Sequence, residues 1–280
     1  METMTMTPET YVQKSLKAFK FAYRATAEEL IDDLCQPYRT EEFQTRLDAG
    51  ESPPKEEYSQ EEQCLREVWS YLVAAHHEQE RKGPIKLEYL PHIYMVAKQR
   101  QLDGADFETI VTAVSHDGKE DGFISDKGYK TYISESSHGR RQYERDMREK
   151  VRADIKDMVC NHGFDGERVV DDMDGLTNPD EYPNGMTKLE WQLAHFKTLP
   201  ERVQRTKIAD KTGNSYDSVH NSPPSFGADK LESIIPSTRD MLEAAGNPEA
   251  QVALYDVIQE DLELVVTMRR AEEIENGKGR

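Results

Sequence analysis

A histidine and an aspartate stand next to each other at the end of an apolar segment, in the run HDGKED at residues 116–121. Apolar residues from Phe107 to Val114 recur at helical spacing before them and predict a buried helix that ends at these two side chains. A neutral imidazole and a carboxylate suit a divalent cation, and the acids Glu120 and Asp121 would then orient a water. The alternative is a solvated turn, which a run of Asp, Gly, Lys and Glu commonly forms.

The elements that must position these residues are predicted to be helices. Apolar periodicity and capping boxes, such as Thr26 with Glu29, indicate helices along most of the chain. Their expected ranges are 7–23, 26 onward, 59–82, 87–100, 107–115, 139–160, 187–195, 199–219, 229–245 and 248–274. Residues 49–58 and 221–227 are predicted loops, and residues 118–185 are the most irregular segment. Because no segment alternates as a strand does, we predict an all-α fold.

The composition restricts the partners and the compartment. The 280 residues contain 36 Lys and Arg against 54 Asp and Glu, a net charge of −18 that repels nucleic acids and anionic membranes. No apolar run approaches the roughly 18 residues that a membrane span needs, and the first residues lack the plan of a signal peptide. The three cysteines (Cys35, Cys64 and Cys160) form no CxxC motif. We therefore expect a cytoplasmic protein with reduced thiols and with neither nucleic-acid nor membrane partners.

Four segments of the chain resemble, in the same order, the motifs of HD-domain phosphohydrolases. Within that group they are similar to the hydrolase domain of RelA/SpoT-type proteins and of the small metazoan SpoT homologues. The segments are AHHEQERK at 75–82, YLPHIYMVA at 89–97, HDGKED at 116–121 and KIADKTGN at 207–214. The resemblance spans about residues 65–218 and implies an HD-domain helical bundle, with additional N- and C-terminal helices in this chain. We predict an N-terminal extension (1–58), a hydrolase core (59–220) and a C-terminal extension (221–280).

The resemblance implies one divalent cation, usually manganese in this family, held by His92, His116, Asp117 and Asp210. Two imidazoles and two carboxylates on packed helices suit such an ion and leave positions open for water and a phosphate oxygen. The alternatives for the two distant residues are structural. His92 lies on an apolar helix face, where a hydrogen-bonded core histidine is common, and Asp210 would otherwise be a surface charge of its helix.

The same resemblance assigns the catalytic and substrate-binding residues. Glu120 and Asp121 would orient or deprotonate the attacking water. Arg81 and Lys82 would bind phosphate oxygens, although the same cations would also complement the dipole at the end of their helix. Asn214, one helical turn after the last metal ligand, would hydrogen-bond the substrate.

The chain departs from the family pattern in several places. Residues 83–91 lack the usual Ser-Gly-x-Pro-Tyr sequence, in a region that helps to hold the nucleotide in relatives. Ile93 replaces a proline, and Gly213 stands where a bulky residue is usual. Residues 122–209 are expanded, and the acids at 171–174 are expected to support the site or the fold without binding the metal.

These observations predict a metal-dependent phosphohydrolase that acts on a small phosphorylated nucleotide. The reaction that fits best is removal of the 3′-pyrophosphate from guanosine tetra- or pentaphosphate, (p)ppGpp. One alternative keeps the site and changes the substrate, as in a nucleotide phosphatase or deoxynucleotide phosphohydrolase of the same superfamily. Another is an inactive helical interaction protein, in which the apolar face of residues 248–274 serves a partner or a homo-oligomer.

Overall fold

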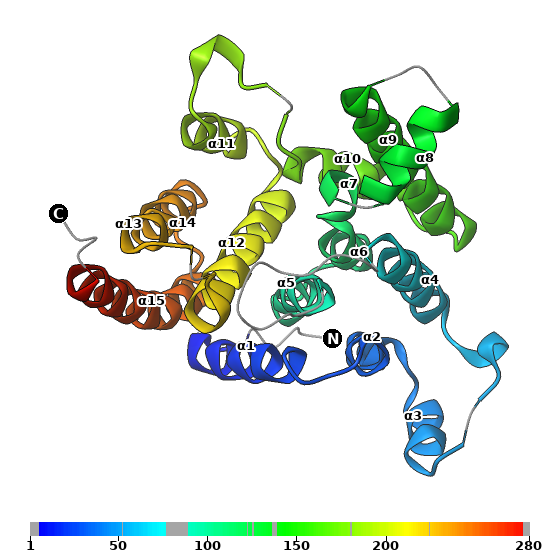
Figure 1. The fold of residues 1–280 in the computed structure, drawn as a ribbon. Helices are drawn as coiled ribbons and strands as arrows, with labels where there is room; N and C mark the ends of the chain where they lie inside the picture. Colours follow the sequence, from blue (N-terminus) through cyan, green and yellow to red (C-terminus); the bar gives the residue numbers. More distant parts are fainter. Residues whose placement is uncertain are drawn as a thin grey trace. The chain divides into compact units, whose positions relative to one another are not determined.

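The structure is a computed structural model that describes residues 6–51, 53–76, 89–121, 123–124, 126–135, 139–179, 181–223 and 225–276. Throughout these ranges the chain forms helices joined by turns, without a β-strand, so the predicted all-α fold is confirmed (Figure 1). The helices are α1 (Pro8–Ala22), α2 (Ala27–Cys35), η1 (Gln36–Tyr38), α3 (Glu41–Asp48), η2 (Lys55–Glu57), α4 (Gln60–Ala75), α5 (Leu90–Leu102), α6 (Phe107–Ser115), α7 (Gly118–Asp121), α8 (Asp126–Glu135), α9 (Arg140–Asn161), α10 (Gly166–Leu176), η3 (Pro183–Gly185), α11 (Lys188–Phe196), α12 (Glu201–Asn221), α13 (Ala228–Glu232), α14 (Ile234–Ala244) and α15 (Glu249–Glu275).

Some helices differ from the sequence-based expectation. The expected ranges contain no separate helix for α3, α8 or α10. Polar N-caps start α3 and α10, because the side chains of Thr40 and Asp165 accept from backbone N–H groups three residues later. Glycines and acidic residues around α10 hide its periodicity. The single helix expected at 229–245 is wrong: it is two helices, α13 and α14, because Pro236 lacks the N–H that would continue the first.

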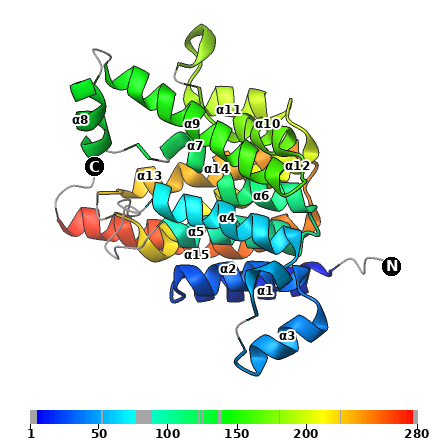
Figure 2. The same ribbon diagram turned by 90° about the vertical axis from the view of Figure 1, so that its right-hand side faces the viewer.

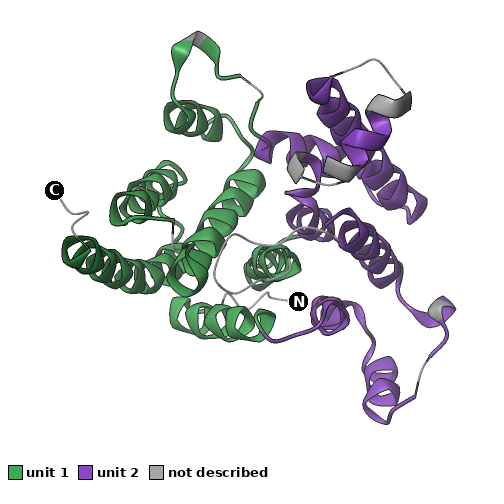
Figure 3. Cartoon of the chain, in the orientation of Figure 1, with its two compact units in different colours: residues 1–23, 80–105, 178–280 green, residues 24–79, 106–177 purple. Residues whose placement is uncertain are grey.

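The chain divides into two compact units that alternate along the sequence (Figure 3). Unit 1 comprises residues 1–23, 80–105 and 178–280, and unit 2 comprises residues 24–79 and 106–177. His92 and Asp210 therefore belong to unit 1, whereas His116 and Asp117 belong to unit 2. The division into a hydrolase core and two extensions follows the sequence motifs instead and stays a prediction.

The central helix of unit 1 is α5. It packs against α1 and α12, and α12 in turn packs against α15 (Figures 1 and 2). Because neighbours contact α5 on several sides, its residues from Leu90 to Arg100 are buried almost without interruption. Apolar clusters join α14 and α15 to α11 and α12, and α13 to α15. The helices at both ends of the chain thus belong to the core of unit 1.

Unit 2 is built on α4, α6, α9 and α10. α4 packs against α2, α6 and α9, and α10 packs against α6 and α9. The short helix α7 lies against α9, and residue 118 must be small for this approach. A Cβ at Gly118 would lie 2.8 Å from Leu72 Cδ2 and 3.6 Å from Val151 Cγ1. The segment that follows His116 is thereby held against the core of unit 2.

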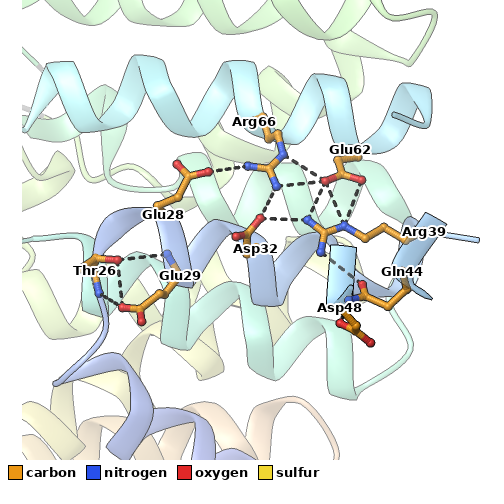
Figure 4. Close-up of polar contacts among 9 residues, drawn as sticks. All are labelled: Thr26, Glu28, Glu29, Asp32, Arg39, Gln44, Asp48, Glu62 and Arg66. Atoms are coloured by element: carbon orange, nitrogen blue, oxygen red, sulfur yellow. Dashed lines mark hydrogen bonds and ion pairs between the residues drawn. The ribbon is translucent and has the colours of Figure 1, made fainter. Parts of the chain in front are cut away.

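A buried ion-pair network joins α2, α4 and the turn after η1 in unit 2 (Figure 4). Glu62, which is 1% exposed, accepts from Arg39 Nε at 3.1 Å and Nη2 at 2.8 Å, and from Arg66 Nε at 3.0 Å. Asp32 accepts from both arginines. The buried carboxylate is tolerated because two guanidinium groups satisfy its oxygens. The network fixes the first turn of α4, the helix that ends just before His76.

Candidate metal-binding residues

In unit 2, His116 and Asp117 lie at the end of α6. His116 is the C-cap of that helix and is 3% exposed. Its Nδ1 lies 2.8 Å from the carbonyl oxygen of Ala113, and because a carbonyl only accepts, Nδ1 carries the proton. The other ring nitrogen, Nε2, lies 3.2 Å from Asp117 Oδ2. The end of α6 thus presents an unprotonated ring nitrogen and a carboxylate oxygen side by side.

Ion pairs hold the backbone that carries this pair. Lys119 Nζ on α7 lies 2.5 Å from Asp174 Oδ1 on α10, and Arg152 Nε on α9 donates to Asp174 Oδ2 at 3.0 Å. Arg152 also pairs with Asp171 at 3.1 Å. These two acids belong to the 171–174 segment, which is predicted to support the site or the fold without binding the metal. In the structure they tie α7, α9 and α10 together within unit 2.

In unit 1, His92 and Asp210 come from two helices, α5 and α12. His92 is 1% exposed and Asp210 is 6% exposed, so both side chains are buried. His92 Nε2 lies 3.3 Å from Asp210 Oδ1. Asp210 also accepts from Asn214 Nδ2 at 2.6 Å and pairs with Lys207 Nζ at 3.1 Å. Three residues of the predicted site, His92, Asp210 and Asn214, thus lie together in unit 1, and Lys207 lies beside them.

The imidazole of His92 packs directly on the backbone of α12. A Cβ at Gly213 would lie 3.3 Å from His92 Nδ1 and 3.4 Å from Cε1, closer than side chains normally approach. The glycine that departs from the family pattern therefore makes room for the ring. On the same helix, Asp217 Oδ2 lies 3.6 Å from His92 Nδ1, and Tyr23 donates a hydrogen bond to Asp217 Oδ1.

No function is predicted from the sequence for Asp217, Tyr23 or Lys207. A signal existed for two of them, because residues three and seven positions from Asp210 share its helix face. In a chain with 54 acidic residues, however, one more aspartate on a helix does not stand out. Tyr23 carries no sequence signal, since only the packing of α1 against α5 and α15 places it.

The structure does not describe the side chains of four predicted site residues, Glu120, Asp121, Arg81 and Lys82. Glu120 and Asp121 are the last residues of α7, and the structure describes their backbone but not their side chains. Arg81 and Lys82 lie outside the described residues, as does the 83–88 part of the altered loop. Their assigned functions therefore stay predictions.

Each histidine–carboxylate pair fits a divalent cation by its chemistry and spacing. Ligand atoms at about 2.1 Å from an ion and at right angles to each other are about 3 Å apart. The nitrogen–oxygen separations of 3.3 Å in unit 1 and 3.2 Å in unit 2 are close to that value. His92, His116 and Asp117 each offer one ligand atom, the first two from buried side chains. Each pair thus supplies half of the ligand set that the motifs imply.

Comparison with known proteins gives one informative match. No family model and no curated protein matches the chain. The fold is similar to a solved structure of a metazoan orthologue of SpoT, which hydrolyses ppGpp and plays a role in starvation responses. The sequence identity is 16%, the match covers 75% of this chain and 97% of that chain, and the TM-score is 0.52. The predicted resemblance to a SpoT-like hydrolase domain is thus confirmed for the fold.

None of the described helices combines the length and the apolar character that crossing a bilayer requires.

Proposed function

We propose that this chain is a metal-dependent phosphohydrolase that removes pyrophosphate from the 3′ position of (p)ppGpp in the cytoplasm. The observation that carries the proposal is the buried His92–Asp210 pair. Its members are 118 positions apart, on different helices, and the resemblance assigns both as ligands. The SpoT-like fold supports the same reaction class.

The metal is proposed to be one divalent cation, Mn²⁺, with His92, His116, Asp117 and Asp210 as ligands. Bound there, the cation would neutralise charge on the phosphate. It would also lower the pKa of a bound water, so that hydroxide is available as the nucleophile at neutral pH. That both pairs hold the same ion rests on the order and identity of the four motifs. The buried imidazoles of His92 and His116 suit metal binding, because a desolvated neutral nitrogen is a strong ligand.

The remaining residues act on the water and the substrate. Glu120 and Asp121, which end α7, accept a proton from the attacking water. Arg81 and Lys82 bind phosphate oxygens through charge-assisted hydrogen bonds. Asn214 donates to Asp210 in the structure, and because an amide has two N–H donors, a bond to the substrate can coexist with this one.

The overall charge explains why local cations matter here. At −18, the chain as a whole repels a nucleotide that carries four or five phosphates. Binding therefore depends on the metal and on nearby lysine and arginine side chains, which act at short range where screening is weakest. Lys207, which pairs with Asp210, adds one positive charge that the structure places next to a proposed ligand.

The first experiment measures pyrophosphate and phosphate release from guanosine tetraphosphate in the presence of Mn²⁺. The parent is compared with Asp117→Ala, and Asp240→Ala, an exposed aspartate on α14, is the matched control. Pyrophosphate release by the parent and the control, but not by Asp117→Ala, supports the proposal. An inert parent that still binds Mn²⁺ counts against this substrate.

A second candidate keeps the site and changes the substrate to another nucleotide, as a phosphatase or a deoxynucleotide phosphohydrolase. The altered sequence at 83–91 favours it, because that region helps to hold the nucleotide in relatives. A panel of nucleoside mono-, di- and triphosphates in the same assay distinguishes the two candidates. If one of these nucleotides is hydrolysed and guanosine tetraphosphate is not, the substrate assignment is wrong and the proposed metal site stands.

Self-association stays a separate proposal. Leu264 and Met268 on α15 are 60% and 57% exposed, as a helix that pairs with a second copy requires. Sedimentation at several protein concentrations tests it, and a monomer at all concentrations contradicts it. Loss of activity on chelation would in turn count against the alternative of an inactive interaction protein.

A further inference from the structure

His92 lies between two carboxylates of the same helix. Asp210 and Asp217 are seven residues apart on α12, which is two turns, so they share one face. His92 Nε2 faces Asp210 Oδ1 at 3.3 Å, and His92 Nδ1 faces Asp217 Oδ2 at 3.6 Å. Gly213, between the two acids, leaves the space that the ring occupies. The ring therefore points one nitrogen at each carboxylate.

We propose that Asp217 is a positioning residue that holds His92 in the tautomer with the proton on Nδ1, and that Tyr23 holds Asp217. The proposal rests on the proposed function, because it concerns the same metal site. A histidine that binds a metal through one nitrogen usually donates its other N–H to a carboxylate, a carbonyl or a water, which fixes the ring and makes the ligand more basic. Asp217 is the carboxylate that faces this second nitrogen, with Oδ2 3.6 Å from Nδ1.

The charges around the two carboxylates favour this direction. The ammonium group of Lys207 lies 3.1 Å from Asp210 Oδ2 and offsets the charge of that acid. Asn214 donates to its other oxygen at 2.6 Å. The attraction of Asp210 for an N–H of His92 is thereby weakened relative to that of Asp217. The proton is drawn to Nδ1, and Nε2 keeps its lone pair next to Asp210.

The N-terminal helix takes part in the site through Tyr23. Tyr23 follows α1 as its C-cap, and its hydroxyl donates to the Asp217 oxygen that does not face His92. Its ring contacts Tyr216 edge to face, with centroids 5.8 Å apart, and Tyr216 also contacts Phe19 of α1 at 4.9 Å. These contacts fix the hydroxyl group that restrains Asp217. The N-terminal helix thus has a part in metal binding beyond its packing.

The test measures Mn²⁺ affinity by following the electron paramagnetic resonance signal of unbound Mn²⁺ during a titration of the full chain. The variants are Asp217→Asn and Tyr23→Phe. Asparagine has nearly the same shape as aspartate, but its amide N–H₂ can face Nδ1 and favour the wrong tautomer. Asp240→Asn is the control for a change of charge, and Tyr132→Phe is the control for the loss of a Tyr–Asp hydrogen bond, that of Tyr132 with Asp146 in unit 2.

We expect Asp217→Asn to weaken Mn²⁺ binding on the order of 10- to 100-fold. Tyr23→Phe should weaken it by a smaller factor, and both controls should stay near the parent value. The ¹⁵N signals of the His92 ring in the metal-free protein provide a second readout, because they distinguish the two tautomers. They should report Nδ1–H in the parent and a shift toward Nε2–H in Asp217→Asn.

The outcomes separate this inference from the proposed function. If Asp217→Asn and Tyr23→Phe bind Mn²⁺ like the parent, Asp217 is not a positioning residue, and the metal site and its activity stand. A variant with a lower thermal midpoint but unchanged affinity shows a structural role only and also overturns the inference. If Asp217→Asn does not fold, Tyr23→Phe decides the test. A parent that binds Mn²⁺ as expected but hydrolyses no nucleotide leaves the inference supported and overturns the function, and a parent that binds no Mn²⁺ overturns both.

Discussion

The two histidines are held by different means in the two units. In unit 2, His116 is fixed by the carbonyl of Ala113, three residues earlier on its own helix, and its carboxylate partner is the next residue. In unit 1, His92 of α5 meets Asp210 and Asp217 of α12, and Gly213 provides the space for its ring. One pair is local in sequence, and the other depends on the packing of two helices.

The two pairs should differ in how well they tolerate substitution of neighbouring residues. The unit 2 pair needs only the end of α6. The hydrogen bond of His116 goes to a backbone carbonyl, which a side-chain substitution does not remove. The unit 1 pair needs two helices at the correct distance and at least four side chains or glycines in place. We therefore expect the histidine–carboxylate pair of unit 1 to be more sensitive to substitution than that of unit 2. The following predictions compare the two pairs and the units that carry them.

The largest effect is expected from removing a carboxylate of either pair. Asp210→Ala and Asp117→Ala should each lower the rate of nucleotide hydrolysis by at least ~10³-fold, or about 4 kcal/mol of transition-state stabilisation. If both pairs hold the same ion, the double variant should be no slower than either single variant, because residues that act as a unit are not additive. Steady-state kinetics of the four proteins provide the test. Losses that multiply in the double variant would mean that the pairs act independently.

The two glycines next to the histidines provide a direct comparison of the units. At Gly213 a Cβ would press on the His92 ring at 3.3 Å, whereas at Gly118 it would meet the flexible end of Leu72 at 2.8 Å. Gly213→Ala should therefore weaken Mn²⁺ binding by roughly 10-fold with little change in stability, since alanine favours a helix by about 1 kcal/mol. Gly118→Ala should instead cost about 1–2 kcal/mol of unfolding free energy through overpacking. Urea unfolding and Mn²⁺ titration of both variants decide, and equal effects on metal binding would contradict the comparison.

The two units should also respond differently to acid. In unit 1, burial raises the pKa of Asp103 although Arg100 opposes the shift. In unit 2, burial acts to raise the pKa of Asp106, but hydrogen bonds from Thr109 and Arg168 prevail and lower it. As the pH falls below about 4, the unfolded state takes up a proton at Asp106 before the folded state does, so unit 2 loses stability. At Asp103 the folded state takes up the proton first, so the same change stabilises unit 1.

The two tryptophans allow the acid response of each unit to be measured. Trp69 lies on α4 of unit 2 and Trp191 lies on α11 of unit 1. Trp191→Phe leaves a reporter for unit 2, and Trp69→Phe leaves one for unit 1. As the pH is lowered, the native fluorescence of unit 2 should disappear at a higher pH than that of unit 1. Transitions that coincide would show that the units unfold together, and the reverse order would show that other carboxyl groups dominate.

The smallest effect concerns the thiols, which all lie in unit 2. Burial raises the pKa of both Cys35 and Cys64 to about 12, whereas Cys160 is exposed. A thiol reagent at neutral pH should therefore modify one cysteine per native chain and the other two only when unit 2 opens. Counting the modified thiols in the parent and in Cys160→Ser tests this expectation. A fast reaction in Cys160→Ser would mean that unit 2 opens readily.

Much of the fold could be predicted because apolar periodicity and N-caps act locally. The helix that ends at His116 and the capping box at Thr26 are predicted from the sequence and present in the structure. The helix α10 could not be seen, because its glycines and acids resemble a loop until Asp165 caps it. The break between α13 and α14 follows from Pro236, a signal present in the sequence and outweighed by the apolar residues around it.

The sequence by itself determined the residue types of the proposed site and the local geometry of one half of it. His116, its backbone partner and Asp117 lie within five residues, so a helix end is enough to assemble them. The tertiary structure alone decided how His92 is held. The contact of α5 with α12 selected Asp217 from the many acids and gave Gly213 its purpose. The packing of α1 then added Tyr23. Those contacts join residues up to 194 positions apart, and no local spacing encodes them, because side chains that are distant in sequence meet only after the helices have buried their apolar faces.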